Sequence, residues 1–131
     1  MQTVTAFVSR DPVTCWQIFT DVNLLTAWVP NLRRVETIAK TQTGLPHEVH
    51  FEYASSMTYT LVYAYDATSR EVHWQPKLGK RDGVTGYARF DAFDSGTRIT
   101  YGIEHGDNRA ASDRNDQQQL VEAFVAFATK R

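Results

Sequence analysis

Residues 47–65 read HEVHFEYASSMTYTLVYAY, and apolar and polar side chains alternate along this stretch. In its first half, Val49, Phe51 and Tyr53 are separated by the polar residues His50 and Glu52. In the second half, the positions that share one face are Met57, Tyr59, Leu61, Tyr63 and Tyr65. Successive side chains of a β-strand point to opposite faces of the sheet. The stretch therefore predicts two antiparallel strands, each with one face buried and one face in water.

Five further segments have the composition of strands and are bounded by turn residues. They are residues 2–9, 33–40, 71–75, 84–93 and 97–105. Asp94-Ser95-Gly96 separates the last two, and these residue types favour the tight turn of a hairpin. The sequence thus predicts a sheet of about seven strands.

Three helices are expected around these strands. Asp11-Pro12 is a favourable helix start, because Asp accepts hydrogen bonds at the N-cap and Pro fits the first helical position. A second short helix follows, capped by Asp21 or Asn23 and stopped by Pro30. Near the end of the chain, Ser112 or Asp113 is the expected cap of a helix of roughly 17 residues. Its apolar stripe comprises Leu120, Val121, Phe124, Val125, Phe127 and Ala128.

An apolar sheet face and an apolar helix stripe must cover one another. We therefore expect an α+β fold in which a strongly bent antiparallel sheet wraps the long C-terminal helix. The two short helices after the first strand should close one end. Residues 1–131 show no linker or repeat, so one domain is predicted.

The composition excludes several classes of function. The net charge of -1 at pH 7 does not favour nucleic-acid binding, and one cysteine, Cys15, excludes an internal disulfide or a multi-cysteine metal site. No apolar run approaches the ~18 residues of a membrane span, and no basic-then-apolar signal segment is seen. We expect a cytoplasmic protein without an integral membrane segment. The chain is rich in rings, with three Trp, six Tyr and seven Phe.

Residues 11–21, 25–36 and 86–101 together resemble the START-like (SRPBCC) superfamily. The resemblance rests on the helix start at Asp11-Pro12, the aromatic-proline corner at residues 28–30 and the Gly96-Thr97-Arg98 turn. It is strongest to small bacterial members of the polyketide cyclase/dehydrase and lipid-transport type. It implies a helix-grip fold with a cavity between the sheet and the long helix. Only 26 residues follow His105, which implies a short helix and a small or open cavity.

The alternation of side chains along the predicted strands places many of the aromatic residues on the sheet face that the C-terminal helix covers. The candidate ligand-cavity residues are Trp28, Phe51, Tyr53, Tyr59, Tyr63, Trp74, Phe90 and Phe124. Aromatic rings supply apolar area, and Tyr or Trp adds a directed polar contact, which suits a mostly apolar pocket. A plain packed core explains each position equally well. Trp28 is expected near the mouth of the cavity.

The polar residues supply no recognisable catalytic or metal-binding motif. His47 and His50 lie three apart on a strand and point to opposite faces, while His73 and His105 lack partners at ligand spacing. We therefore expect no metal and no cofactor, and we assign no catalytic residue. Glu48, His50 and Glu52 form either an acid–base cluster or, more simply, the solvated face of the sheet.

The leading hypothesis is a monomer or homodimer that binds or carries a hydrophobic or amphipathic small molecule. Tyr53, Ser55 and Tyr59 would add polar specificity. A cyclase or dehydratase of the polyketide type is the first alternative, and a protein-interaction module without ligand is the second. A cavity of a few hundred Å3 lined by Trp28, Phe51, Tyr59 and Trp74 would favour the first two. A filled core with an exposed apolar patch would favour the third.

Overall fold

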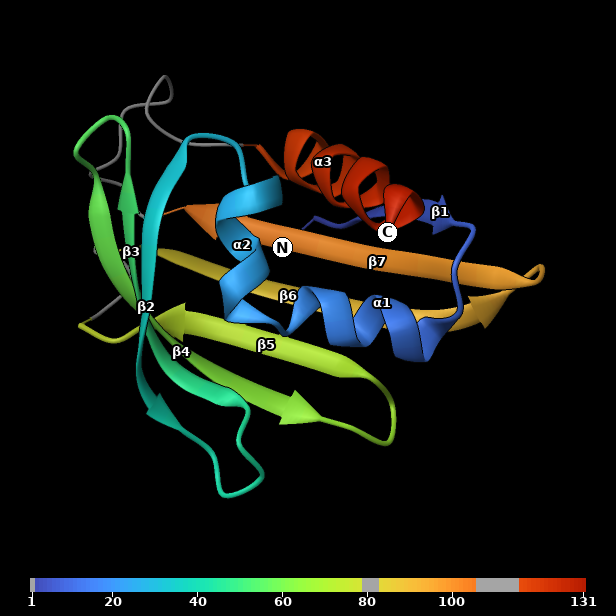
Figure 1. Ribbon diagram of the computed structural model, residues 1–131, viewed down its shortest axis with the longest axis horizontal. Helices are drawn as coiled ribbons and strands as arrows, with labels where there is room; N and C mark the ends of the chain where they lie inside the picture. The colour runs from blue at the N-terminus through green and yellow to red at the C-terminus, as the bar shows by residue number, and fades with distance from the viewer. Residues whose placement is uncertain (1, 79–82, 106–115) are drawn as a thin grey trace.

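The computed structural model describes residues 2–78, 83–105 and 116–131, and its fold is an α+β helix grip (Figure 1). Within these residues, seven strands form one antiparallel sheet in the order β1-β7-β6-β5-β4-β3-β2. The strands are β1 (Val4–Val8), β2 (Leu32–Lys40), β3 (Pro46–Tyr53), β4 (Thr58–Asp66), β5 (Glu71–Pro76), β6 (Val84–Phe93) and β7 (Gly96–His105). The helices are α1 (Pro12–Phe19), α2 (Val22–Trp28) and α3 (Gln117–Lys130). The predicted fold class is confirmed.

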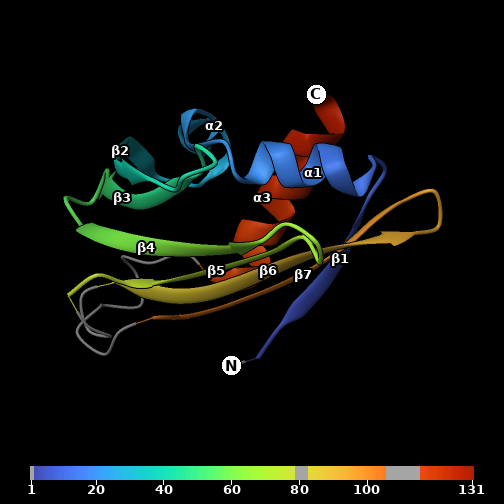
Figure 2. The ribbon, with the colours of Figure 1, turned by 90° about the horizontal axis from the view of Figure 1, so that it is seen from below.

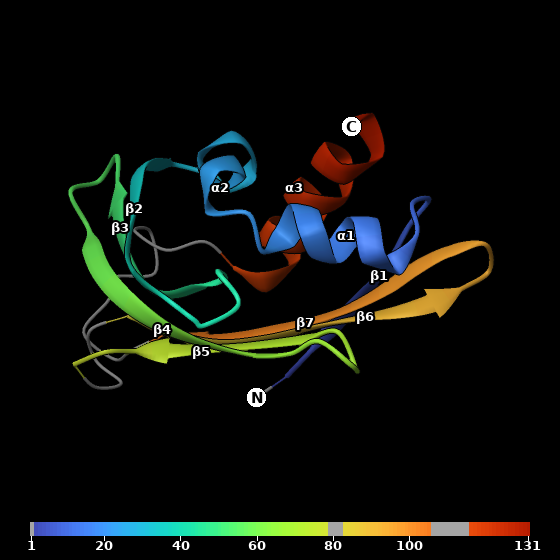
Figure 3. The same cartoon turned by 60° about the horizontal axis from the view of Figure 1, so that its bottom comes forward.

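The sheet is bent toward the helices. Figures 2 and 3 show the three helices on one side of the sheet, with the β2–β3 hairpin curling toward that side. The burial of β3 and β4 follows the predicted alternation, since Val49, Phe51, Tyr53, Tyr59 and Leu61 are all buried. The concave, helix-covered face therefore holds the core.

The β6–β7 hairpin is tighter than the sequence indicates. Phe93 pairs directly with Gly96, so only Asp94 and Ser95 form the turn. Both have positive φ values, 52° and 66°, as a type I′ turn requires. Gly96 is the first residue of β7, and a side chain does not fit there because an added Cβ would lie 2.4 Å from the Val8 carbonyl oxygen.

Aspartates cap all three helices. The Asp11 carboxylate accepts hydrogen bonds from the Thr14 amide at 3.1 Å and the Thr14 hydroxyl at 2.5 Å, as the sequence predicts. Asp21 caps α2 and accepts from the Asn23 amide. The cap of α3 is Asp116, whereas the expected caps Ser112 and Asp113 lie outside the described residues.

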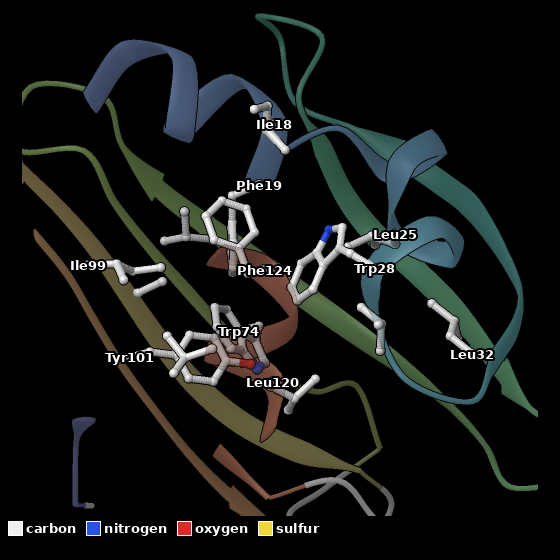
Figure 4. Packing of buried hydrophobic residues seen from close by; sticks show 14 of the residues in the cluster. Ile18, Phe19, Leu25, Trp28, Leu32, Trp74, Ile99, Tyr101, Leu120 and Phe124 are labelled. Carbon is white, nitrogen blue, oxygen red and sulfur yellow. The ribbon is translucent and has the colours of Figure 1, made fainter. Parts of the chain in front are cut away.

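One phenylalanine links the helices to the sheet. The Phe19 ring, at the end of α1, lies 5.4 Å from the Phe124 ring of α3 and 5.7 Å from the Trp28 ring of α2. It also lies 5.3 Å from the Phe90 ring and 5.8 Å from the Trp74 ring, which are both on the sheet. Figure 4 shows Phe19, Trp28, Trp74 and Phe124 converging between the helices and the sheet. Phe19 therefore joins every layer of the fold.

We predict that Phe19→Ala lowers the free energy of unfolding by about 3–5 kcal/mol, because it leaves a cavity among five other rings. Phe7→Ala is the matched control, since the Phe7 side chain is 46% exposed, and it should cost less than about 1 kcal/mol. Urea unfolding measures both. Equal losses in the two variants would contradict the central role of Phe19.

Candidate functional site

An apolar cavity opens between the concave face of the sheet and helices α2 and α3. Residues from all three helices and from β3 to β7 line it. The lining comprises Phe19, Leu25, Trp28, Val29, Phe51, Tyr53, Met57, Tyr59, Leu61, Tyr63, Trp74, Val84, Tyr101, Ile103, His105 and Leu120. No arginine, lysine or carboxylate is among these residues. The surface therefore suits an apolar body that carries few polar groups.

The cavity is narrow. About 590 Å3 is free of atoms when the open mouth is counted, but only about 60 Å3 can hold the centres of water-sized molecules. The smaller value decides what fits, because the larger one includes bulk solvent. It is well below the few hundred Å3 of a typical ligand pocket, so the cavity has the expected lining but not the expected volume. The rings that line the cavity also fill most of it, so a ligand larger than a few atoms enters only when side chains move.

Six of the eight candidate residues line the cavity. They are Trp28, Phe51, Tyr53, Tyr59, Tyr63 and Trp74. Phe90 and Phe124 do not line it, and both are almost fully buried beside Phe19. They belong to the packed half of the core, which shares the same sheet face. The alternation of side chains along a strand shows which face of the sheet they occupy. It does not show whether that part of the face is packed or lines a cavity.

Trp28 lies inside the fold, with only 7% of its surface exposed. Its ring lies 5.1 Å from the Phe124 ring, at the end of the short helix α2. The indole Nε1 is buried and has no hydrogen-bond partner within the described residues. Trp28 thus forms part of the wall between the cavity and the packed core.

Tyrosines supply most of the polar character of the cavity. The Tyr53 and Tyr59 hydroxyls lie 2.5 Å apart in a buried hydrogen bond. Burial raises the pKa of Tyr59 and of Tyr63 well above the ordinary value, and it also raises the pKa of Tyr101. These phenols stay neutral at physiological pH. They can donate hydrogen bonds to a ligand oxygen without adding a charge to the cavity.

Ten of the lining residues are not predicted from the sequence, although the sequence contains part of the signal for them. Tyr101, Ile103 and His105 all line the cavity and lie at alternate positions of β7. They share the inner face with the fully buried Ile99, so the period of the strand could have assigned them. His105 was set aside for lack of a metal partner, although its place on that face was available.

The remaining polar candidates lie away from the cavity. His50 hydrogen-bonds to the Thr60 hydroxyl, and Glu48 pairs with Lys77 at 2.9 Å. Ser55 is exposed in the turn between β3 and β4. Glu48, His50 and Glu52 therefore lie on the outer face of the sheet. Within the described residues, no cluster of three His, Cys, Asp or Glu side chains could hold a metal ion.

Cys15 is buried on α1, and burial raises the pKa of its thiol. The thiol is therefore protonated and weakly nucleophilic at neutral pH.

No helix in the described part of the chain has the length and apolar character needed to span a bilayer.

No family model and no curated protein matches the sequence, but solved structures match the fold closely. A protein of Thermus thermophilus superposes with a TM-score of 0.77 at 11% identity, covering 98% of this chain and 93% of that chain. The STAR-related lipid transfer protein fragment of Xanthomonas axonopodis gives 0.69 at 12% identity, covering 96% and 84%. The chain has the START-like fold. The Zhui aromatase/cyclase of a Streptomyces species gives 0.69 at 16% identity, covering 99% and 93%. At these identities the likeness establishes the START-like fold alone.

The Trp74 indole rests directly on Gly86 of the neighbouring strand β6. An added Cβ at Gly86 would lie only 2.1 Å from Trp74 Cε2, so the glycine makes room for the ring. The sheet backbone lies behind Gly86, and a larger residue there must push Trp74 toward the cavity.

We predict that Gly86→Ala destabilises the protein by about 1–3 kcal/mol, because it overpacks this contact. The near-ultraviolet circular dichroism of the tryptophans should change with it. In a Trp74→Phe background the same substitution should cost much less, since the smaller ring leaves space for the methyl group. An equal cost in both backgrounds would contradict the assigned contact.

Proposed function

We propose that the protein binds a hydrophobic or amphipathic small molecule, of lipid or polyketide type, in the cavity between the sheet and α3. The observation that carries the proposal is the lining itself, which joins aliphatic and aromatic side chains to neutral tyrosine hydroxyls. A plain core would bury these groups against one another without an opening. Here they border a space that is continuous with solvent.

Burial of ligand surface supplies the affinity. Each 100 Å2 of ligand apolar area removed from water contributes about 2.5 kcal/mol. The narrow cavity must widen for this, and Met57 is the lining residue best suited to move. It precedes β4, is only partly buried and has a flexible unbranched side chain.

The named structural neighbours support a ligand of this class. One is a STAR-related lipid transfer protein and another is an aromatase/cyclase. Both names concern molecules with large apolar parts. The proposal for this chain rests on its own cavity, and the neighbours make the ligand class consistent with the fold.

A cyclase or dehydratase activity is the second candidate, and one observation favours it. His105 lines the same cavity as the hydrogen-bonded Tyr53 and Tyr59 hydroxyls. An imidazole that titrates near neutrality can move a proton, while a phenol donates to a ligand oxygen. Deuterium exchange at the carbon next to the carbonyl of a bound ketone, followed by NMR, tests this reading. Exchange that His105→Gln leaves unchanged would contradict it.

Native mass spectrometry of the protein purified from its own host tests the binding proposal. We expect one non-covalent adduct that is lost on denaturation, because the apolar lining of the cavity buries most of the ligand surface. Met57→Trp should abolish the adduct, since the indole fills the cavity from the β3–β4 turn. Phe93→Trp is the matched control, because the Phe93 side chain is 45% exposed and lies outside the cavity lining.

The result that would contradict ligand binding is the absence of any adduct, together with unchanged tryptophan emission across a panel of lipids and polyketides. That outcome would favour the interaction module. The melting temperature of each variant separates loss of binding from loss of folding.

A further inference from the structure

A polar groove borders the apolar cavity on the far side of Tyr53. The groove has a volume of about 490 Å3. Its lining comprises Arg33, Arg34, Glu52, Tyr53, Ser56 and Thr58. Tyr53 belongs to the linings of both the groove and the cavity, so the two spaces meet the chain at the same residue.

An irregularity in β2 places two consecutive arginines beside this groove. Leu32 pairs with Tyr53 and Arg34 pairs with Glu52, so two steps along β2 match one step along β3. Arg33 is the extra residue of a β-bulge, a feature that redirects side chains. In a regular strand Arg33 and Arg34 would point to opposite faces. Here both are exposed and both line the groove.

The two arginines differ in their electrostatic partners. Arg34 lies 3.5 Å from a Glu52 carboxylate oxygen and 3.8 Å from a Glu36 carboxylate oxygen. None of the ion pairs within the described residues involves Arg33. Arg33 is thus the guanidinium of the groove lining whose charge is not engaged in an ion pair within the described residues.

The turn between β3 and β4 contributes residues to the linings of both the groove and the cavity. Ser56 lines the groove, and the next residue, Met57, lines the cavity. The Tyr53 amide donates a hydrogen bond to the Met57 carbonyl at 2.9 Å, and the Ser56 amide donates to the Tyr53 carbonyl at 3.0 Å. Because Ser56 and Met57 are consecutive residues of this turn, the groove and the cavity reach adjacent positions of the chain.

We infer that the ligand is an amphipathic organic anion, whose apolar body occupies the cavity while its anionic head group binds Arg33 in the groove. The inference rests on the proposed function and adds the charge and the orientation of the ligand. A guanidinium suits a carboxylate, sulfonate or phosphate head group because it donates two parallel hydrogen bonds. The cavity lining itself offers no arginine or lysine, so the anionic end must remain outside it.

A matched pair of fluorescent probes tests this assignment. N-phenylnaphthylamine is neutral, and anilinonaphthalene sulfonate has the same rings with one added anionic group. We expect Arg33→Gln to weaken the sulfonate probe about three- to fivefold at low salt, a typical effect for an exposed ion pair. The neutral probe should change less than about twofold. The loss should shrink at high salt, because ions screen an exposed charge.

Two further variants keep the test specific. Arg98→Gln removes the same charge from the outer face, where Arg98 lies over the Phe93 ring, and it should leave both probes unchanged. Arg33→Lys keeps the charge but loses the two parallel hydrogen bonds, so its sulfonate affinity should lie between those of the unmodified protein and Arg33→Gln. If both probes bind but Arg33→Gln weakens neither more than Arg98→Gln does, the head-group assignment is wrong and the cavity proposal stands. If neither probe binds, the cavity proposal fails and the head-group assignment fails with it.

Discussion

The contact between Phe19 and the rings around it is the interaction on which the rest of the fold depends. Phe19 touches Phe124 on α3, Trp28 on α2, and Phe90 and Trp74 on the sheet. This cluster fixes the distance between the helices and the concave face. The cavity lies directly against this cluster, because Phe19, Trp28 and Trp74 belong to the cluster and also line the cavity.

The sequence predicts the fold well because the fold rests on repeating patterns. The alternation from Val49 to Tyr53 assigns a strand and its buried face, and Asp11-Pro12 assigns a helix start. The site is predicted less completely, because its boundary is a matter of packing. Tyr63 and Phe90 share an inward-facing pattern, yet only Tyr63 borders the cavity. The alternation of apolar and polar residues in the sequence also gives no sign of the bulge at Arg33. A bulge is defined by the pairing of two strands, which the sequence of one strand does not contain.

The abundance of aromatic residues has two consequences in one molecule. Around Phe19 the rings interlock into a solid core, and around Tyr59 they line a space of about 60 Å3. The packed rings and the cavity-lining rings thus occupy neighbouring parts of the same face of the sheet. The neutral tyrosines add hydrogen-bond donors where the core ends, and the arginines of β2 add charge beyond them. Polarity increases from the core to the surface, as the binding of an amphipathic molecule requires.

If the cavity beside Met57 receives the ligand, NMR with the neutral probe N-phenylnaphthylamine will detect the probe there. Intermolecular nuclear Overhauser effects should link the probe to the methyl groups of Met57, Leu61 and Ile103, which all line the cavity. Resonances of the exposed Phe7 and Phe93 on the outer face should not move. Contacts confined to Phe7 and Phe93, with the cavity methyl groups unaffected, would contradict the account.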